Sequence, residues 1–491
     1  MECGWSGRAG SCLGGTGDAF LRAFATAPPT PLPTRQFDVG LAALSSEAAG
    51  LVAAAFKQLD SLWLAQPLFN PSPVQATWAP LLPAFLETLI RGREHPLTSL
   101  TVLGSLPLSL ELCSVLSSAT QLTQLSAWFR LTEPDHASAI ANLTSLKSLS
   151  ITTCTPQLLP ALLSPLTALT SLSLSLYSTR LPTGRVSALS GLVSLRAGKA
   201  TLDVRTLTQL TSLTTLAISG LVLPPTSGIA ELAGSYPSSY LLPPNLGEVE
   251  AACAAPEALH ALRASPVRQL TWQIGVVMDR GQHFDNDTGA LTELGEAGLC
   301  DAAAFLAGRM DAGSDVWIGT ENSTVLLPVG GEVGAGPARR NHTAWLEALG
   351  RAGVPRLTLD HVSLSHHDLT TLSAHTGLKR LDLSDGTQYP TRGLLVLPRA
   401  PALELLTLDV TEWCGPDREG PFEPPPDLPG MLQALLFTHP QLRIELCCRE
   451  TVGVLMMDQV HELASELAEE LGHMGDPRPN RLAVDLHRED D

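Results

Sequence analysis

Lysine and long apolar stretches are scarce in this chain of 491 residues. Lysine occurs only at Lys57, Lys147, Lys199 and Lys379, so arginine supplies most of the positive charge, and the formal net charge is −18. An acidic surface of this size repels phosphate backbones and anionic lipid, which makes nucleic acid and membrane surfaces poor candidates as partners. Because no run of about 18 apolar residues occurs, we expect no membrane-spanning helix.

Motifs of nucleotide-binding and hydrolytic sites are missing as well. There is no G-K-[ST] sequence, and the glycines of 330–340 do not follow G-x-G-x-x-G. No G-x-S-x-G sequence marks a nucleophilic serine. His461–Glu462 lacks the second histidine of H-E-x-x-H. We therefore expect a non-enzymatic protein with no catalytic residue, no cofactor and no small-molecule substrate.

One cluster of potential metal ligands, His361, His366, His367 and Asp368, lies in DHVSLSHHDL. A zinc or other transition-metal site needs three or four ligands that converge from fixed positions. Most of this segment follows a predicted strand and should pass over the edge of the fold, which would separate the side chains. We expect exposed loop histidines here and no metal site.

Cysteine usage and the N-terminal sequence indicate a reduced, cytoplasmic location. The nine cysteines are odd in number, irregularly spaced and without a C-x-x-C pair. The first residues, MECGWSGRAG, do not resemble a secretory signal. Glycosylation sequons at Asn142, Asn286, Asn322 and Asn341 leave a secreted or cell-surface location as the alternative.

A short pattern, L-x-x-L-x-[LVIA], recurs through the chain from Leu97 onward. Its middle position falls, at nearly constant spacing, on Leu100, Leu125, Leu149, Leu172, Leu195 and Leu216. The pattern returns with similar spacing at Leu357, Leu381 and Leu406, and a single copy centres on Leu270. Repetition at a nearly fixed period of this length indicates a solenoid of stacked units.

Alternation within the pattern predicts short strands. Successive side chains of a strand point to opposite faces, so the leucines share one face and the intervening residues share the other. A single unit of about 23 residues buries too few leucines to fold alone, and it must stack on its neighbours. We expect the strands to pair in parallel, while segments such as 156–165 return as short helices or turns.

These residues resemble leucine-rich repeats of an irregular, intracellular type, over roughly residues 95–450 with gaps. Typical repeats carry Asn or Cys five residues after the middle leucine, and only Cys154 fits, so no subclass is assigned. The resemblance implies an α/β solenoid, a horseshoe with parallel strands on its concave face. A helical N-terminal cap and a helix-strand C-terminal cap would close the two ends of the repeat array.

Spacing and composition divide the chain further. We expect disorder in 1–36, a helical cap in 37–94 (helices near 40–64 and 80–91), and repeats in 95–274. Residues 275–353 are either oversized repeats or an inserted subdomain, with the first reading favoured. Repeats continue in 354–450, interrupted by a Pro-rich excursion at 419–430. Residues 451–491 form the C-terminal cap, with an amphipathic helix at 454–474 and a last strand at 481–490.

Two sets of residues are candidates for partner contact on the concave face. Trp128 and Phe129 follow the second strand of the first block, and aromatic anchors within a polar surface are typical of interaction hot spots; the alternative is that one ring packs inward. The later block is charged instead, with candidates Arg356, Asp360, His361, Arg380, Asp382, Asp385 and Asp409. Such a wall suits a protein partner of complementary charge.

The sequence thus predicts a cytoplasmic scaffold that binds one or more proteins. A structural role in cilia, for instance in the axoneme, or in the cytoskeleton fits this class. The first alternative is a secreted or cell-surface recognition module. A second is an adaptor resembling substrate receptors of ubiquitin ligases, although LLPAFLETLI at 81–90 matches an F-box poorly.

Overall fold

The computed structural model describes residues 36–40, 49–50, 52, 58–65, 80–91, 96–181, 186–224, 240–285, 287–320, 325–328, 341–384, 386–410, 425–449, 460–467, 469 and 481–487. The chain divides into two compact units. Unit 1 comprises Met1–Leu202, Gln209–Ile218 and Pro243–Asn245, and unit 2 comprises Asp203–Thr208, Ser219–Leu242 and Leu246–Asp491.

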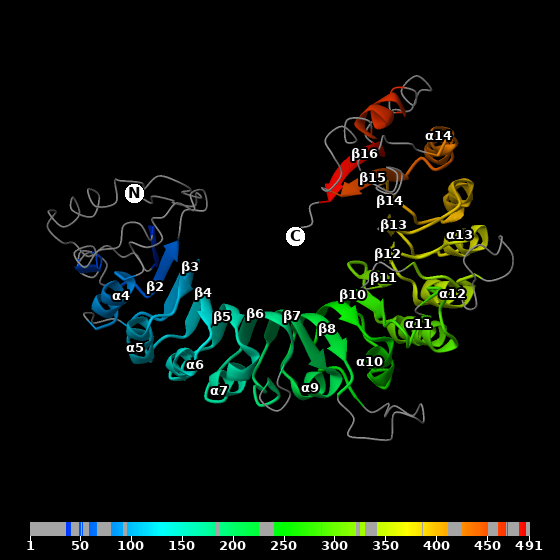
Figure 1. Cartoon of the computed structure of the whole chain (residues 1–491). Coiled ribbons are helices and arrows are strands. Elements are labelled where there is room, and N and C mark those ends of the chain that lie inside the picture. The colour runs from blue at the N-terminus through cyan, green and yellow to red at the C-terminus, as the bar shows by residue number, and fades with distance from the viewer. Residues whose placement is uncertain are drawn as a thin grey trace. The chain divides into compact units, whose positions relative to one another are not determined.

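Sixteen strands in the described residues follow one another in chain order across a hydrogen-bonded sheet (Figure 1). Those of unit 1 are β1 (Gln36–Gly40), β2 (Ser61–Ala65), β3 (Ser99–Pro107), β4 (Gln124–Leu131), β5 (Ser148–Cys154), β6 (Ser171–Arg180) and β7 (Ser194–Asp203). Those of unit 2 are β9 (Glu248–Ala254), β10 (Thr271–Met278), β11 (Asp315–Thr320), β12 (Arg356–Asp360), β13 (Arg380–Ser384), β14 (Leu405–Asp409), β15 (Arg443–Arg449) and β16 (Leu482–His487), while β8 (Thr215–Val222) has residues in both. Every pair from β1 to β7 and from β9 to β16 is parallel, which confirms the leucine-rich-repeat fold.

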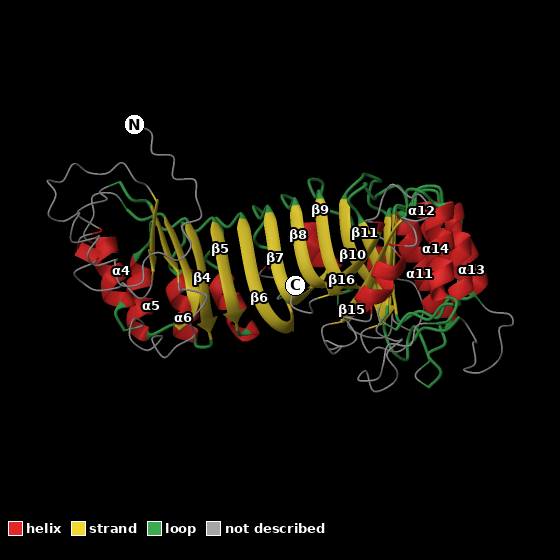
Figure 2. Cartoon of the chain, turned by 90° about the horizontal axis from the view of Figure 1, so that it is seen from above, coloured by secondary structure: helices red, strands yellow, loops and turns green. Residues whose placement is uncertain are grey.

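Helices and turns lie along one face of the sheet in each unit (Figure 2). Unit 1 has α4 (Leu82–Arg91), α5 (Leu110–Ser118), α6 (Pro134–Ala141), the 3-10 turn η2 (Pro156–Leu158) and α7 (Leu159–Leu163). Unit 2 has α10 (Pro256–Ala261), α11 (Glu293–Leu306), α12 (Thr343–Ala352), α13 (His366–Ser373), the 3-10 helix η4 (Thr391–Arg399) and α14 (Leu428–Thr438), and it also contains all of α9 (Val204–Gln209) except its last residue. Their starts carry the expected signals: the hydroxyls of Ser109, Thr292 and Ser365 accept hydrogen bonds from the third backbone N–H of α5, α11 and α13.

A continuous row of leucines forms the core of unit 1. The register pairs Leu62, Leu100, Leu125, Leu149, Leu172 and Leu195 on successive strands. Each of these side chains is at most 1% exposed. The middle leucines of the pattern therefore form the spine that the sequence predicts, shared between units that could not fold singly.

The predicted helix over 40–64 is wrong in its last part. Residues 61–65 form β2, in which Leu62 and Leu64 are buried and Trp63 between them is 40% exposed. With Leu59 they complete another copy of L-x-x-L-x-L. The apolar spacing of 51–62 resembles a helix, but pairing with β3 and burial in the leucine row decide the conformation. The second helix of this region occurs as α4.

Residues 275–353 contain the end of β10 and the whole of β11, which pairs with β10 on one side and β12 on the other. Helices α11 and α12 pack against each other on the helical side. Strand β11 is therefore part of the main sheet. Arg309, which follows α11, is buried in this region: its guanidinium donates to the carbonyls of Phe305 and Ser265, and its carbonyl accepts from the Trp272 indole N–H at 3.1 Å.

The ends of the chain are described only in part. Of the expected C-terminal helix, 460–467 is helical, with Val460, Ala464 and Leu467 buried and Glu462 and Glu466 exposed, and β16 is the last strand. Disorder was expected in 1–36: residues 1–35 lie outside the described residues, and Gln36 begins β1, which corrects the boundary. Most of the Pro-rich excursion also lies outside the described residues. Residues 428–430 of that excursion begin α14.

Replacing one spine leucine should destabilise unit 1 strongly. Leu172→Ala leaves a cavity in a side-chain row that cannot collapse, so the free energy of unfolding should fall by about 2–5 kcal/mol. Ser173→Ala, the adjacent residue on the opposite face, should change it by less than about 0.5 kcal/mol. Urea denaturation followed by circular dichroism measures both, and equal effects would contradict the proposed spine.

A buried histidine makes the stability of unit 2 depend on pH. His342 is 1% exposed, its Nδ1 accepts from the Trp345 indole N–H at 3.1 Å, and burial lowers the pKa of His342 to about 4. The unfolded chain keeps a histidine pKa of about 6.5 and takes up a proton first. Stability is therefore fully present above this pH and falls, by about 1.4 kcal/mol per pH unit, as the pH decreases towards 4.

The variant His342→Asn tests this origin, because the asparagine carbonyl oxygen can still accept from Trp345 but does not titrate. Its unfolding free energy, measured by denaturant titration between pH 7 and 4.5, should decline less steeply than that of the wild type. His375, whose pKa is also lowered by burial, should account for part of the remaining slope. An unchanged slope in the variant would rule out His342 as its source.

Candidate functional site

The sheet face opposite the leucines carries polar side chains in register in unit 1. Ser126, Ser150, Ser173 and Arg196 pair on successive strands β4–β7. Trp63 on β2 and Thr101 on β3 belong to the same row. From β3 to β6 the row is formed by small hydroxyl side chains.

The two predicted aromatic contacts of unit 1 point in opposite directions. Trp128 is 44% exposed and lies on the outward face, whereas Phe129 is fully buried. Phe129 was expected among the partner-binding residues, and the structure corrects this: alternation along β4 places it on the core side. Trp128 stays a candidate for contact.

Two charged rows cross unit 2. Arg356, Arg380, Leu405 and Arg443 pair in one row, and Thr358, Asp382, Thr407 and Glu445 pair in the next. By strand alternation, the described outward positions of β9–β15 carry the acids Glu248, Glu250, Asp315, Asp360, Asp382, Asp409 and Glu445, and the arginines Arg356, Arg380 and Arg443. Of these acids, Asp360 and Asp382 are buried. Seven carboxylates against three cations give the described part of this face a net charge of −4.

The predicted charged residues differ in how available they are. Arg380 and Asp382 lie on the same strand and form an ion pair, in which the Arg380 Nε is 2.8 Å from the Asp382 Oδ2. Asp360 and His361 are both buried, with the His361 Nδ1 at 2.7 Å from the Asp360 carboxylate. His361 has a left-handed φ of 52° and packs beside Gly386, so it offers little surface to a partner.

Of the remaining candidates, Arg356 is exposed at the start of β12 and Asp409 is partly exposed at the end of β14. Asp385 lies outside the described residues. Among the charged candidates in the described residues, Arg356 is the most accessible.

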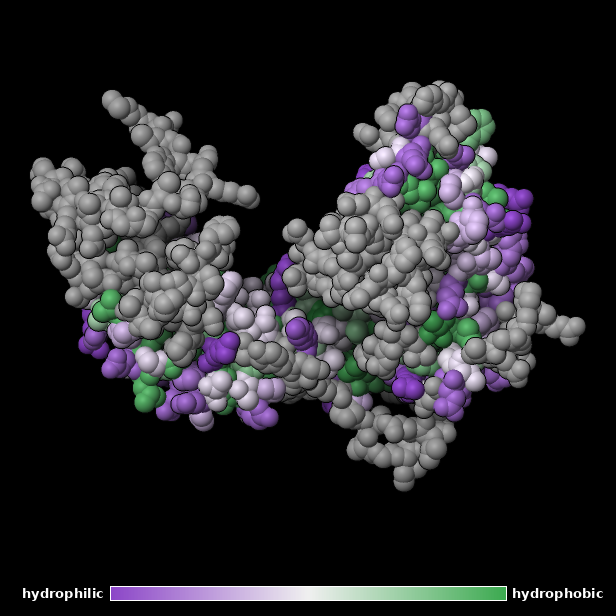
Figure 3. Space-filling model, turned by 45° about the horizontal axis from the view of Figure 1, so that its top comes forward, coloured by the Kyte–Doolittle hydropathy of each residue, from purple (hydrophilic) through white to green (hydrophobic). Residues whose placement is uncertain are grey.

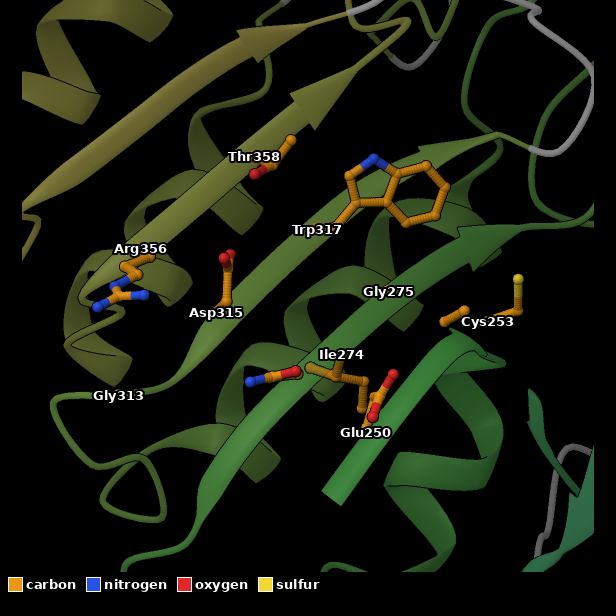
Figure 4. Close-up of a pocket in the computed structure, with 11 residues that line it drawn as sticks. Glu250, Cys253, Ile274, Gly275, Gly313, Asp315, Trp317, Arg356 and Thr358 are labelled. Atoms are coloured by element: carbon orange, nitrogen blue, oxygen red, sulfur yellow. The ribbon is translucent and has the colours of Figure 1, made fainter. Parts of the chain in front are cut away.

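A groove of about 610 Å³ crosses this face over β9–β12, within unit 2. Its lining includes Glu250 and Cys253 from β9, Gln273 and Gly275 from β10, Asp315 and Trp317 from β11, and Arg356 and Thr358 from β12. Figure 4 shows the labelled side chains on neighbouring strands, with the Arg356 guanidinium directed away from Trp317.

Trp317 is the central aromatic residue of the groove. Figure 4 shows its indole broadside to the viewer, lying over the sheet. It can lie this low because the two positions beneath it lack a side chain: a Cβ added to Gly275 would be 2.6 Å from the indole Cε3, and one added to Gly319 would be 2.8 Å from Cζ2. The indole is partly exposed, so an aromatic surface is available in the groove.

The carboxyl group of Asp315 sits in an unfavourable electrostatic environment. Partial burial and the nearby Asp382 raise its pKa, and Arg380 and Arg356 offset only part of this effect. An additional cation nearby would stabilise the ionised form of this carboxyl group. The groove therefore combines a flat aromatic surface with an under-neutralised acid.

The sequence reading missed Trp317, Asp315 and Glu250. The sequence DVWIG at 315–319 does carry a signal, because alternation around the apolar Val316 and Ile318 places Trp317 on the outward face of a strand. The irregular spacing of 275–353 hid the fact that this strand belongs to the main sheet. The two glycines beneath the ring come from pairing in space and carry no sequence signal.

The histidine cluster does not form a metal site in the described residues, where no group of three His, Cys, Asp or Glu side chains is placed to bind an ion. Asp368 instead completes a capping box with Ser365 at the start of α13, and its Oδ1 accepts from the His342 backbone N–H at 2.7 Å. His366 and His367 are exposed in the first turn of that helix.

The helical side offers less to a partner. Its exposed large apolar side chains, such as Leu110, Leu294 and Phe437, are single residues on different helices. Figure 3 shows hydrophilic and hydrophobic side chains interspersed on the visible described surface. Among the described helices, none is long and apolar enough to span a bilayer.

No family model and no curated protein matches the sequence. Solved structures with a similar repeat architecture include an internalin from Listeria monocytogenes, with 16% identity and a TM-score of 0.34 over 64% of this chain and 80% of that chain. A plant peptide hormone receptor gives 12% identity and a TM-score of 0.32 over 89% and 65%. The Arabidopsis receptor kinase HAESA gives 12% and 0.29 over 84% and 65%. This chain therefore spans just under two thirds of each receptor, and the likeness carries no functional argument.

Filling the space under Trp317 should displace the indole. In Gly275→Ala the new methyl group would meet the ring and the backbone of Ala252, so the protein should lose roughly 1–3 kcal/mol of stability and change its tryptophan signal. Near-ultraviolet circular dichroism and urea denaturation measure the two effects. Gly198→Ala on β7 is the control, because a Cβ there has no atom within 4 Å.

Proposed function

We propose that this protein is a non-enzymatic scaffold that binds a partner protein through the outward face of its parallel sheet, with the Trp317 groove as the main contact. The observation that carries the proposal is the partly exposed indole held over Gly275 and Gly319 in a charged groove. Aromatic residues in such positions supply much of the binding free energy at protein interfaces, and charged surroundings add specificity.

The pairing state of the arginines supports this assignment. Arg380 and Arg443 are neutralised by Asp382 and Glu445 on their own strands. Arg356, exposed at the edge of the groove, forms no ion pair within the described residues. It is therefore available to a partner, unlike its two neighbours in the same row.

Partner capture from native extract tests the proposal. Proteins retained by the wild-type chain should be lost with Trp317→Ala, with an affinity loss of at least about 2 kcal/mol, or roughly 30-fold, when a purified partner is titrated. Phe437→Ala is the matched control, because this exposed phenylalanine lies on α14, outside the groove. Equal losses in both variants, or none in Trp317→Ala, would contradict a groove contact.

We further propose a cytoplasmic location, with a ciliary or cytoskeletal role as the first candidate within it. The irregular cysteine pattern supports this location. Co-purification of tubulin-associated proteins would support the cytoskeletal role. Buried Leu82, Phe85 and Leu89 in α4 weigh against the ubiquitin-ligase adaptor, because an adaptor contact would need such residues exposed.

A secreted or cell-surface recognition module remains the second candidate, because the two sequon asparagines in the described residues are accessible. Asn142 is exposed at the C-terminal end of α6, and Asn341 is partly exposed. If the protein is secreted, enzymatic removal of N-glycans from native material should increase its electrophoretic mobility, and Asn142→Gln should abolish part of this shift. An unchanged mobility would count against this candidate.

A further inference from the structure

The negative charge on the outward face of unit 2 is a local property. Among the described outward-facing residues of β2–β7 in unit 1, the charged ones are Arg130, Arg196 and Lys199, and none is acidic. The corresponding face of unit 2 has a net charge of −4. The acidity of the whole chain would not by itself produce opposite signs of charge on the two faces. The negative charge is therefore specific to the outward face of unit 2.

The chemistry of the groove is suited to a cation. The face of an indole carries partial negative charge and attracts an ammonium or guanidinium group placed over it. The carboxyl groups of Asp315 on the same strand and Glu250 on β9 line the same groove, and neither forms an ion pair in the described residues. The one arginine of the lining, Arg356, turns away from the ring in Figure 4.

From this arrangement we infer that the groove binds a lysine or arginine side chain of an extended basic segment of the partner, with the cation over Trp317 and beside Asp315 and Glu250. This inference rests on the proposed function and specifies the chemistry of the partner. An acidic segment would bring its carboxylates next to two unpaired carboxylates on a face that is already negative. An uncharged segment would leave Asp315 with only the partial compensation from Arg380 and Arg356, and would add no cation beside Glu250.

Defined peptides and the full-length chain test the inference. The probes are four fluorescein-labelled Gly/Ser peptides of a dozen residues, carrying three lysines, three trimethyllysines, three glutamines or three glutamates. Anisotropy titrations should show binding of the lysine and trimethyllysine peptides, since trimethylation keeps the charge and the contact with an aromatic face. The glutamine peptide should bind at least about 10-fold more weakly. Raising the salt concentration should weaken lysine-peptide binding.

Variants locate the contact. Trp317→Leu should weaken binding of the lysine peptide by about 2- to 30-fold, the range expected for a cation on an aromatic face. Asp315→Asn should weaken it while leaving the fold intact, because the charged carboxyl is unfavourable in the free protein. This second variant keeps the test valid if Trp317→Leu fails to fold. Phe437→Ala and Arg196→Ala, both outside the groove, should bind as the wild type does.

The outcomes separate the inference from the function on which it rests. Binding that requires Trp317 but is equal for the lysine and glutamine peptides, or strongest for the glutamate peptide, overturns the cation site and leaves the groove as a protein contact. A captured partner whose Trp317-dependent segment is neutral or acidic does the same. A partner that binds equally well to Trp317→Leu and wild type overturns both.

Discussion

The shared row of buried leucines is the constraint on which the rest of this structure depends. No single repeat buries enough apolar surface to be stable, so each strand must align its leucines with those of the neighbouring strands. In unit 1 this alignment runs from Leu62 to Leu195 without a shift at the middle position. Because side chains alternate along a strand, fixing the leucines inward also fixes which residues face outward.

That constraint determines the surface available for recognition. Trp128 and Phe129 are adjacent in sequence, yet one is exposed and the other buried. In unit 2 the same rule turns Asp315, Trp317 and Arg356 outward while Val316, Ile318 and Leu357 enter the core. The groove is thus a by-product of core packing, modified by two glycines that let the indole lie low over the sheet.

The sequence allowed the repeat class, the strand direction and the inward leucines to be predicted, because all three follow from a periodic pattern. The prediction from sequence was wrong at β2. There the apolar residues have helical spacing but also contain a copy of the repeat pattern that begins at Leu59, and pairing with β3 favours the strand. The sequence also left residues 275–353 unresolved between two arrangements. The candidate groove could be predicted only in part: Arg356 is among the residues named from the sequence, but the position of Trp317 depends on Gly275, which is brought beside it only by strand pairing.

Unequal repeat lengths have a consequence for how such a surface changes over time. Val316 and Leu357 are adjacent in the sheet, as Leu125 and Leu149 are, although a much longer stretch of chain connects the first pair than the second. Since the register is set by the strands, the helical return segment can grow or shrink without moving the outward rows. Changes in loop and helix length therefore leave the outward face of the sheet in place, and that face can change by substitution of single side chains.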